Sequence, residues 1–366
     1  MPRPLADAGH HLLIGLRPSP VLTAADRALL ADLRPAGIVL FRGNFRHDLP
    51  YADWLDSHAR LLADVRDAIG RDRILVAIDH EGGRVCRTPA PITRFAPAAS
   101  WPGQAAAVGA AMGRELASLG VNLNFAPVLD INSNPANPVI GDRSFGADAG
   151  TVTAAGRALA AALLAQGVLP CAKHFPGHGD TDVDSHHALP VLNHDLDSLR
   201  ARELAPFAAL AADGIPLVMT SHILFPTLDA REPVTLSPRF ITGLLRQELG
   251  FTGVVVTDDL GMKAVDHLYD DPAAAVRTVA AGCDLLVVCA ANTDTERCRG
   301  FAAALAAAMD DPDLAPILRQ SRARVDGLLA RAAQHAVTPL PPDLLTTHAG
   351  IAPLWQGATA AVMEKR

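Results

Sequence analysis

Apolar positions in this chain are gathered into eight short runs, separated by longer stretches of mixed character. Each run is apolar nearly throughout and rich in Val, Ile and Leu, which indicates strands that are covered on both faces. The stretches between them are rich in Ala, Leu and Arg, as is typical of helices. The runs are "HHLLIGL" (10–16), "GIVLF" (37–41), "ILVAID" (74–79), "VNLNFAPV" (121–128), "VLPCAKHF" (168–175), "PLVMTS" (216–221), "GVVVTD" (253–258) and "DLLVVCA" (284–290).

Three of the intervening stretches carry signals for the ends of helices. Residues 23–33 begin with a Thr that can cap a helix, and residues 103–120 and 149–167 each end on a Gly. Eight strands that alternate with helices predict an α/β fold, a (β/α)8 TIM-type barrel in one domain over residues 1–335. We expect residues 336–366 to form a tail that packs on the barrel or is partly ordered.

The composition narrows the class of protein. The chain of 366 residues has 32 Lys and Arg against 39 Asp and Glu, a net charge of −7. This charge and the lack of a basic stripe argue against a nucleic-acid partner. Five cysteines without a C-x-x-C pair indicate a reducing, cytoplasmic setting. The sequence has neither a signal-peptide pattern nor an apolar run of about 18 residues, so we expect no membrane partner. The expected partner is a small molecule, and the expected state is a monomer or weak homo-oligomer.

Polar and ionisable side chains mark five successive strand ends, from the third strand to the seventh. The C-terminal ends of barrel strands meet at one face, so these side chains predict a single polar pocket. A simpler alternative is that a carboxylate there only caps the next helix, as Asp259 could. Arg143, in the loop after the fourth strand, could pair with Asp142 or Asp130 and only shape that loop. The strand-end residues are Asp79, Asp130, Lys173, His174, Ser221, His222, Asp258 and Asp259.

The stretch "KHFPGHGDTDVDSHH" (173–187) gathers four histidines and four aspartates. It could hold a metal ion, but it has neither an H-x-H on a strand nor an H-E-x-x-H on a helix. His178 and Asp180 could instead form hydrogen bonds within the loop. A third interpretation is proton transfer, in which Asp184 orients the imidazole of His186 two residues later.

Four motifs in chain order resemble those of glycoside hydrolase family 3, in its single-domain β-N-acetylglucosaminidase branch. They are "IDHEGGRV" (78–85), "GDRSFG" (141–146), "KHFPGHGDTDVDSHHALP" (173–190) and "TDDLGM" (257–262). The resemblance implies a nucleophile, Asp258, and an acid/base, His186, on a mobile loop with Asp184 as its partner. It also implies that no metal or cofactor is needed and that the sugar is bound by Asp79, Arg87, Arg143, Lys173 and His174. His80 departs from the family pattern, in which glutamine is frequent, as do Cys86 and Thr88 around Arg87.

The chemistry of glycoside cleavage agrees with these assignments. Cleavage through a covalent intermediate needs an ionised carboxylate beneath the anomeric carbon and a proton donor near the leaving oxygen. We expect Lys173 or a nearby arginine to keep Asp258 ionised, and Asp259 to be turned aside. Histidine can serve as the donor because its ordinary pKa, roughly 6.5, lies near working pH. The segment "GHGDTDVDS" (177–185) is polar and contains glycines, as expected of a loop that opens and closes.

The sequence therefore predicts a retaining exo-β-N-acetylglucosaminidase that forms a glycosyl-aspartate intermediate. The resemblance implies a muropeptide substrate and a role in peptidoglycan recycling. Within the family, a β-glucosidase or β-xylosidase is an alternative, but those larger enzymes take a glutamate acid/base from a second domain with no counterpart here. Further alternatives are attack by the substrate's own acetamido group, transfer to phosphate instead of water, a metal-dependent hydrolase and a non-catalytic sugar-binding barrel.

Overall fold

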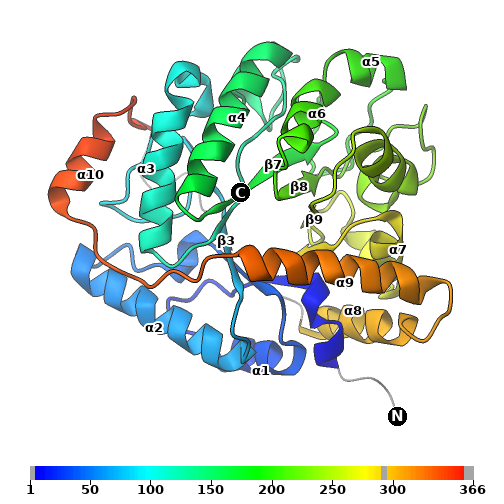
Figure 1. Cartoon of the computed structure of the whole chain (residues 1–366), viewed down its shortest axis with the longest axis horizontal. Helices are drawn as coiled ribbons and strands as arrows, with labels where there is room; N and C mark the ends of the chain where they lie inside the picture. The colour runs from blue at the N-terminus through cyan, green and yellow to red at the C-terminus, as the bar shows by residue number, and fades with distance from the viewer. Residues whose placement is uncertain (1–4, 290–294, 358–366) are drawn as a thin grey trace.

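The computed structural model describes residues 5–289 and 295–357, and these residues form a closed barrel of eight strands surrounded by helices (Figure 1). Residue 290 of the last predicted strand and residues 358–366 of the predicted tail lie outside the described residues. Neighbouring strands are parallel and follow the order β1-β10-β9-β8-β7-β6-β3-β2 around the barrel. The predicted (β/α)8 barrel is confirmed. Its strands are β1 (Leu12–Gly15), β2 (Gly37–Leu40), β3 (Leu75–Ile78), β6 (Leu123–Asn124), β7 (Leu169–Phe175), β8 (Leu217–Thr220), β9 (Val254–Asp259) and β10 (Leu285–Val288).

The helices begin and end largely where the sequence indicated. The hydroxyl of Thr23 caps α1 by accepting from the amide of Asp26 at 3.0 Å. After α4 the chain turns back toward β7 through Gly167, whose φ of 76° disfavours any side chain. The helices are α1 (Ala24–Leu33), α2 (Tyr51–Ile69), α3 (Ala105–Ser118), α4 (Ala149–Ala165), α5 (Leu196–Ala201), α6 (Leu204–Ala212), the π-type helix η8 (Arg239–Glu248), α7 (Ala273–Ala281), α8 (Thr295–Ala308), α9 (Leu314–Arg331) and α10 (Pro342–Ala349).

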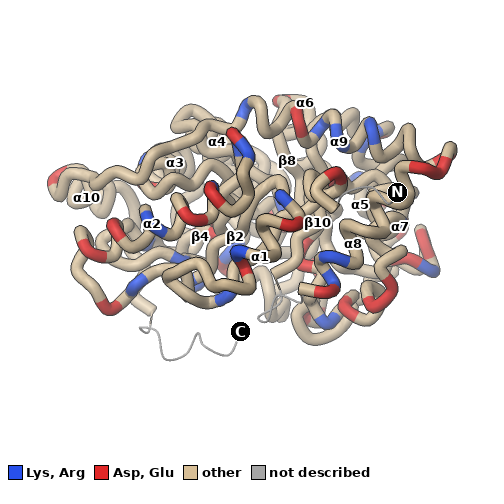
Figure 2. The backbone as a smooth tube through the Cα atoms, turned by 90° about the horizontal axis from the view of Figure 1, so that it is seen from below, with Lys and Arg blue, Asp and Glu red and all other residues tan. Residues whose placement is uncertain are grey.

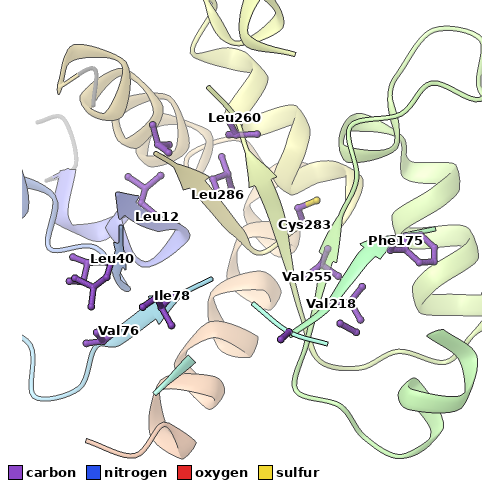
Figure 3. Packing of buried hydrophobic residues seen from close by; sticks show 14 of the residues in the cluster. Leu12, Leu40, Val76, Ile78, Phe175, Val218, Val255, Leu260, Cys283 and Leu286 are labelled. Atoms are coloured by element: carbon purple, nitrogen blue, oxygen red, sulfur yellow. The ribbon is translucent and has the colours of Figure 1, made fainter. Parts of the chain in front are cut away.

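Alternate residues of each strand enter two different apolar layers. Val76, Ile78 and Val255 point outward and pack in the layer between strands and helices, with other residues labelled in Figure 3. Leu75 and Val254 point inward and fill the barrel together with side chains from the other strands. Burial on both faces explains why the strands are apolar at nearly every position instead of at every second one.

Helix α9 closes the N-terminal end of the barrel. Val325 and Leu328 on this helix pack in the same cluster as the inward-facing strand residues. The fully buried carboxylate of Asp284, just before β10, accepts from Arg324 on α9 at 2.9 Å and from Arg246 on η8 at 2.6 Å. The helices and strands are thus joined at this end by charged hydrogen bonds. The opposite, C-terminal end is left for the polar side chains.

The segment that follows α9 lies against α3 and the loop after β3. Phe95 forms a β-bridge with Leu354, and the amide of Ala96 donates to the carbonyl of Pro353 at 2.7 Å. Beneath this contact, His348 of α10 lies 2.7 Å from the buried carboxylate of Glu115 in α3. In Figure 1, α10 accordingly lies beside α3 at the edge of the molecule.

Basic and acidic residues are mixed on the side of the molecule that Figure 2 shows, and no continuous basic stripe runs across this view. None of the helices in residues 5–289 and 295–357 combines the length and the apolar character needed to cross a bilayer.

We predict that Glu115→Ala lowers the free energy of unfolding by about 3 kcal/mol, because it leaves buried donors without their acceptor. The amide and hydroxyl of Thr93 and the ring of His348 all bond to this carboxylate. The change should also make residues 342–357 easier to cleave with a protease. Urea unfolding and limited proteolysis measure both effects.

The control is Glu248→Ala, which removes an exposed ion pair with Arg200 and should change the stability by less than about 1 kcal/mol. Equal stability losses in the two variants would contradict the importance of the Glu115 contacts.

Candidate active site

Lys173 is the centre of a buried charge network at the C-terminal end of the barrel. Its side chain is 3% exposed, and its ammonium group lies 2.8 Å from Asp79 and 2.6 Å from Glu81. Arg143 donates to both oxygens of Glu81 from Nε at 2.8 Å and from Nη2 at 2.9 Å. Arg143 therefore pairs with Glu81, and the alternative of a pair with Asp142 or Asp130 was wrong.

The charges of this network stabilise one another. Burial by itself would raise the pKa of Glu81, but Arg143 and Lys173 hold that pKa well below its ordinary value. Burial likewise opposes ionisation of Asp79, whereas Lys173 and Arg87 lower its pKa. Burial would lower the pKa of Lys173, yet its two carboxylates raise it. All these groups consequently remain charged at neutral pH.

Arg87 extends the network toward solvent from the hairpin formed by β4 (His80–Gly82) and β5 (Val85–Cys86). Its Nη2 lies 3.7 Å from Asp79, and its guanidinium lies 5.8 Å from the ring centre of Phe41. Its Nε is buried and has no hydrogen-bond partner among the described residues. Two departures from the family pattern meet in this hairpin, where Sγ of Cys86 lies 3.6 Å from Nδ1 of His80.

His174 is held on the opposite side of the site by Asp130. Its Nδ1 lies 2.6 Å from Oδ2 of Asp130, which is fully buried. The other oxygen of Asp130 accepts from the amide of His178 at 2.7 Å and from the amide of His174 at 3.2 Å. A carboxylate facing Nδ1 fixes the proton there, so Nε2 of His174 is the nitrogen left for other contacts.

Asp258 and its neighbour Asp259 lie at the end of β9 with different roles. Burial would raise the pKa of Asp258, but the charges of His174, His222 and His186 and the amide of Asp259 lower it. We expected Lys173 or an arginine to keep Asp258 ionised, and this was wrong because those cations neutralise Asp79 and Glu81. The Asp259 carboxylate accepts from the amides of Gly261 at 3.0 Å and Cys289 at 2.8 Å, so it is turned aside as predicted. Burial raises the pKa of Asp259 to about 6.

The first half of the loop after β7 is held in place by contacts with the loop after β6. His178 is buried, and its carbonyl accepts from the Asn137 side chain at 2.8 Å. A Cβ at Gly179 would lie 1.7 Å from the carbonyl oxygen of Ile131, so this glycine permits close packing of two loops. The loop is also tied at Ser185, whose carbonyl accepts from Ala264 at 3.2 Å. These contacts hold both ends of the segment 177–185, and its opening and closing stays a prediction.

His186 and Asp184 form a hydrogen-bonded pair at the exposed part of this loop. Oδ1 of Asp184 accepts from Nδ1 of His186 at 2.8 Å and from the His186 amide at 2.9 Å. Burial opposes ionisation of Asp184, but these two hydrogen bonds lower its pKa. The His186 side chain is 60% exposed. It is also near enough to Asp258 to help lower the pKa of that carboxylate. Since Nδ1 faces a carboxylate, Nε2 is free to exchange a proton with a ligand.

The other polar residues of this loop have structural contacts. His178 bonds to Thr181 at 2.8 Å and to Ser185 at 3.1 Å, and burial lowers its pKa to about 4. Asp180 contacts Ser133 and His194. In the part of the chain that the structure describes, no group of three or more His, Cys, Asp or Glu side chains has a geometry that could hold a metal ion.

Sequence reasoning gave no role to two residues of the site, Glu81 and His222. Glu81 stands two positions after Asp79, and residues two apart in an extended segment point to the same side. This spacing was a usable signal that both carboxylates face Lys173. His222 was counted among the strand-end residues of the predicted pocket, but its contacts come from residues distant in sequence, so its particular role had no local signal.

Comparison with known proteins agrees with this geometry. Residues 16–325 match the family model described as "Glycosyl hydrolase family 3 N terminal domain". A β-hexosaminidase of Methylococcus capsulatus is 39% identical over 278 residues, which cover 74% of this chain and 80% of the relative. β-Hexosaminidase A of Pseudoalteromonas piscicida is 40% identical over 290 residues, or 72% of this chain and only 48% of that longer relative.

A solved structure with the same architecture is the glycoside hydrolase family 3 β-N-acetylglucosaminidase from Paenibacillus sp. str. FPU-7. It superposes with a TM-score of 0.84 at 36% identity, over 94% of this chain and 67% of that one. The barrel, the order of the four motifs and these similarities lead to one assignment. The chain belongs to glycoside hydrolase family 3 and is a glycoside hydrolase related to the β-hexosaminidases of that family.

Proposed function

We propose that this chain is a retaining exo-β-N-acetylglucosaminidase that removes a terminal, non-reducing N-acetylglucosamine through a covalent glycosyl-aspartate. The observation that carries the proposal is the position of Asp258, a half-buried carboxylate with a lowered pKa at the barrel mouth, within electrostatic reach of the His186–Asp184 pair. The names of the related β-hexosaminidases and β-N-acetylglucosaminidase support the choice of sugar.

In the first step, a carboxylate oxygen of Asp258 forms a bond to the anomeric carbon while the bond to the leaving oxygen breaks. Protonated His186 gives its Nε2 proton to that oxygen, and Asp184 stabilises the imidazolium during the approach. In the second step, His186 takes a proton from water, the water oxygen bonds to the anomeric carbon, and the ester to Asp258 breaks. Two displacements on opposite faces retain the configuration.

Asp79 and Arg87 are the groups best suited to hold sugar hydroxyls. Their side chains are 20% and 27% exposed, whereas those of Lys173 and Arg143 are almost covered. A carboxylate and a guanidinium side by side can accept from and donate to adjacent hydroxyls. We assign Lys173, Arg143 and His174 to the inner wall of the sugar site, where Glu81 keeps the first two in place.

We further propose that the natural substrate is a muropeptide from peptidoglycan turnover, handled in the cytoplasm. The family resemblance supports the substrate, and five cysteines that are all free support a reducing compartment.

Transfer to phosphate instead of water is the second candidate. It is favoured because a neutral histidine base does not repel an incoming phosphate anion, whereas a carboxylate base would. Release of sugar 1-phosphate only when phosphate is added would identify it.

Asp258→Ala should abolish hydrolysis of a chromogenic N-acetylglucosaminide, because no carboxylate remains to attack the anomeric carbon. We expect a fall in kcat of at least about 1,000-fold. A fluorinated substrate that stalls at the covalent stage should label the wild type on Asp258, as peptide mass spectrometry would show. An active enzyme without a label on Asp258 would favour attack by the substrate's acetamido group.

His186→Ala should spare substrates with good leaving groups more than natural ones, since only the latter need proton donation. The expected loss of kcat is about 100-fold larger for an alkyl glycoside than for an activated aryl glycoside. Asp182→Asn is the matched control in the same loop, because this residue is exposed and takes no part in the site contacts described above. Equal losses on both substrates would rule out His186 as the acid.

Glu81→Gln should raise KM about tenfold with a smaller effect on kcat, because Lys173 and Arg143 lose the anion that sets their positions. The wild type should also be more stable than the variant above pH 4.5, the ordinary pKa of Glu. Since folding lowers this pKa, the advantage must shrink as the pH falls through the folded value. Kinetics and urea unfolding at several pH values measure both effects. An unchanged KM would show that Glu81 has no part in the sugar site.

A further inference from the structure

His222 lies directly behind Asp258 and Asp259 and is fully buried. Its Nε2 lies 3.0 Å from the carbonyl oxygen of Asp259. Its Nδ1 lies 2.8 Å from the hydroxyl of Thr235, in the short helical turn η7 (Val234–Leu236). Because the ring has no exposed surface, His222 cannot itself contact a substrate at the barrel mouth.

The proton positions follow from the partners of the ring. A carbonyl oxygen only accepts, so Nε2 of His222 must donate to Asp259. Burial lowers the pKa of His222, with the charge of Asp258 acting in the opposite direction. In the neutral ring Nδ1 is an acceptor, and the Thr235 hydroxyl is the group placed to donate to it. Thr220, 2.9 Å from the Thr235 oxygen, can donate in turn.

Thr235 also suits the charged form of the ring. Its hydroxyl lies 3.0 Å from the carbonyl of Ser221, to which it can turn when Nδ1 carries a proton. The hydroxyl thus satisfies the ring in either state, and in both states Nε2–H keeps its bond to Asp259. Among side-chain groups, a hydroxyl is the one that combines a good donor and a good acceptor in a single atom.

The backbone of Asp259 is what aims the carboxylate of Asp258. The Asp259 amide donates to Oδ1 of Asp258 at 2.8 Å. The direction of that amide depends on how residue 259 is held, and its carbonyl accepts from His222 at 3.0 Å and from the amide of Met262 at 3.1 Å. A displacement of even 1 Å at a reacting group can cost about 100-fold in rate.

We propose that His222, oriented by the Thr235 hydroxyl, is a positioning residue that fixes the backbone of Asp259 and thereby the attacking carboxylate of Asp258. This inference rests on the proposed role of Asp258 as nucleophile. In this proposal, a chain of hydrogen bonds runs from Thr220 through Thr235 and His222 to the backbone at the end of β9.

Two pairs of variants test the chain on an activated aryl N-acetylglucosaminide, for which attack by Asp258 and not proton donation limits the first step. Thr235→Val removes the hydroxyl, whereas Thr235→Ser keeps it. His222→Asn cannot reach the Asp259 carbonyl, whereas His222→Gln places an amide N–H near the position of Nε2. We expect Thr235→Val and His222→Asn to lose about 10- to 100-fold in kcat with KM within about twofold, and their conservative partners to recover most of the loss.

Thr278→Val is the control for stability, because Thr278 is also a buried hydroxyl with two hydrogen bonds, to Tyr269 and Ala274, in α7. It should lower Tm as much as Thr235→Val does without changing kcat. The proposal is overturned if Thr235→Val and His222→Asn behave like this control, or if Ser and Gln give no rescue. Failure of the proposed function would look different, since the wild type itself would then be inactive and unlabelled at Asp258.

Discussion

The ammonium group of Lys173 is buried at the mouth of the barrel, and much of the site follows from the need to neutralise it. An unpaired cation at this depth would cost several kcal/mol, so two carboxylates from the chain after β3 must approach it. Without Arg143 from the loop after β6, the second carboxylate, Glu81, would be left with too little positive charge around it. One buried charge thereby fixes three segments that are far apart in sequence.

The two ends of the barrel use buried charge for different purposes. At the N-terminal end, Asp284 has all its partners within the protein, so the charge joins η8, α9 and β10 and offers nothing to a ligand. At the C-terminal end, Asp79, Arg87 and Asp258 are only partly satisfied by the protein. This contrast is the usual division in such barrels, in which one face stabilises the fold and the other carries the chemistry.

The sequence was sufficient for the strands and for the position of the polar cluster, because burial on both faces leaves an apolar run and polar residues mark the ends of five successive strands. The sequence was insufficient to predict which charged side chains pair with each other. Which cation meets which carboxylate depends on the closure of the barrel, so Lys173 was assigned to Asp258 instead of to Asp79 and Glu81, and Arg143 was given the wrong alternative partners. The same limit hid the contacts of His222, whose partner Thr235 lies 13 residues later in the chain. Glycine content likewise did not reveal that Gly179 permits close packing against Ile131.

The backing of the β4–β5 hairpin is completed from a remote part of the chain. The carbonyl of Phe95 accepts from Gly83 in that hairpin, while the same segment is bridged to Leu354. Beneath it, His348 and Glu115 are 233 residues apart in sequence. During synthesis on the ribosome, the hairpin therefore lacks its backing until residues 348–355 have emerged, long after the last strand has been made. Contacts of such long range are slow to form, so docking of α10 is expected to be among the late events of folding.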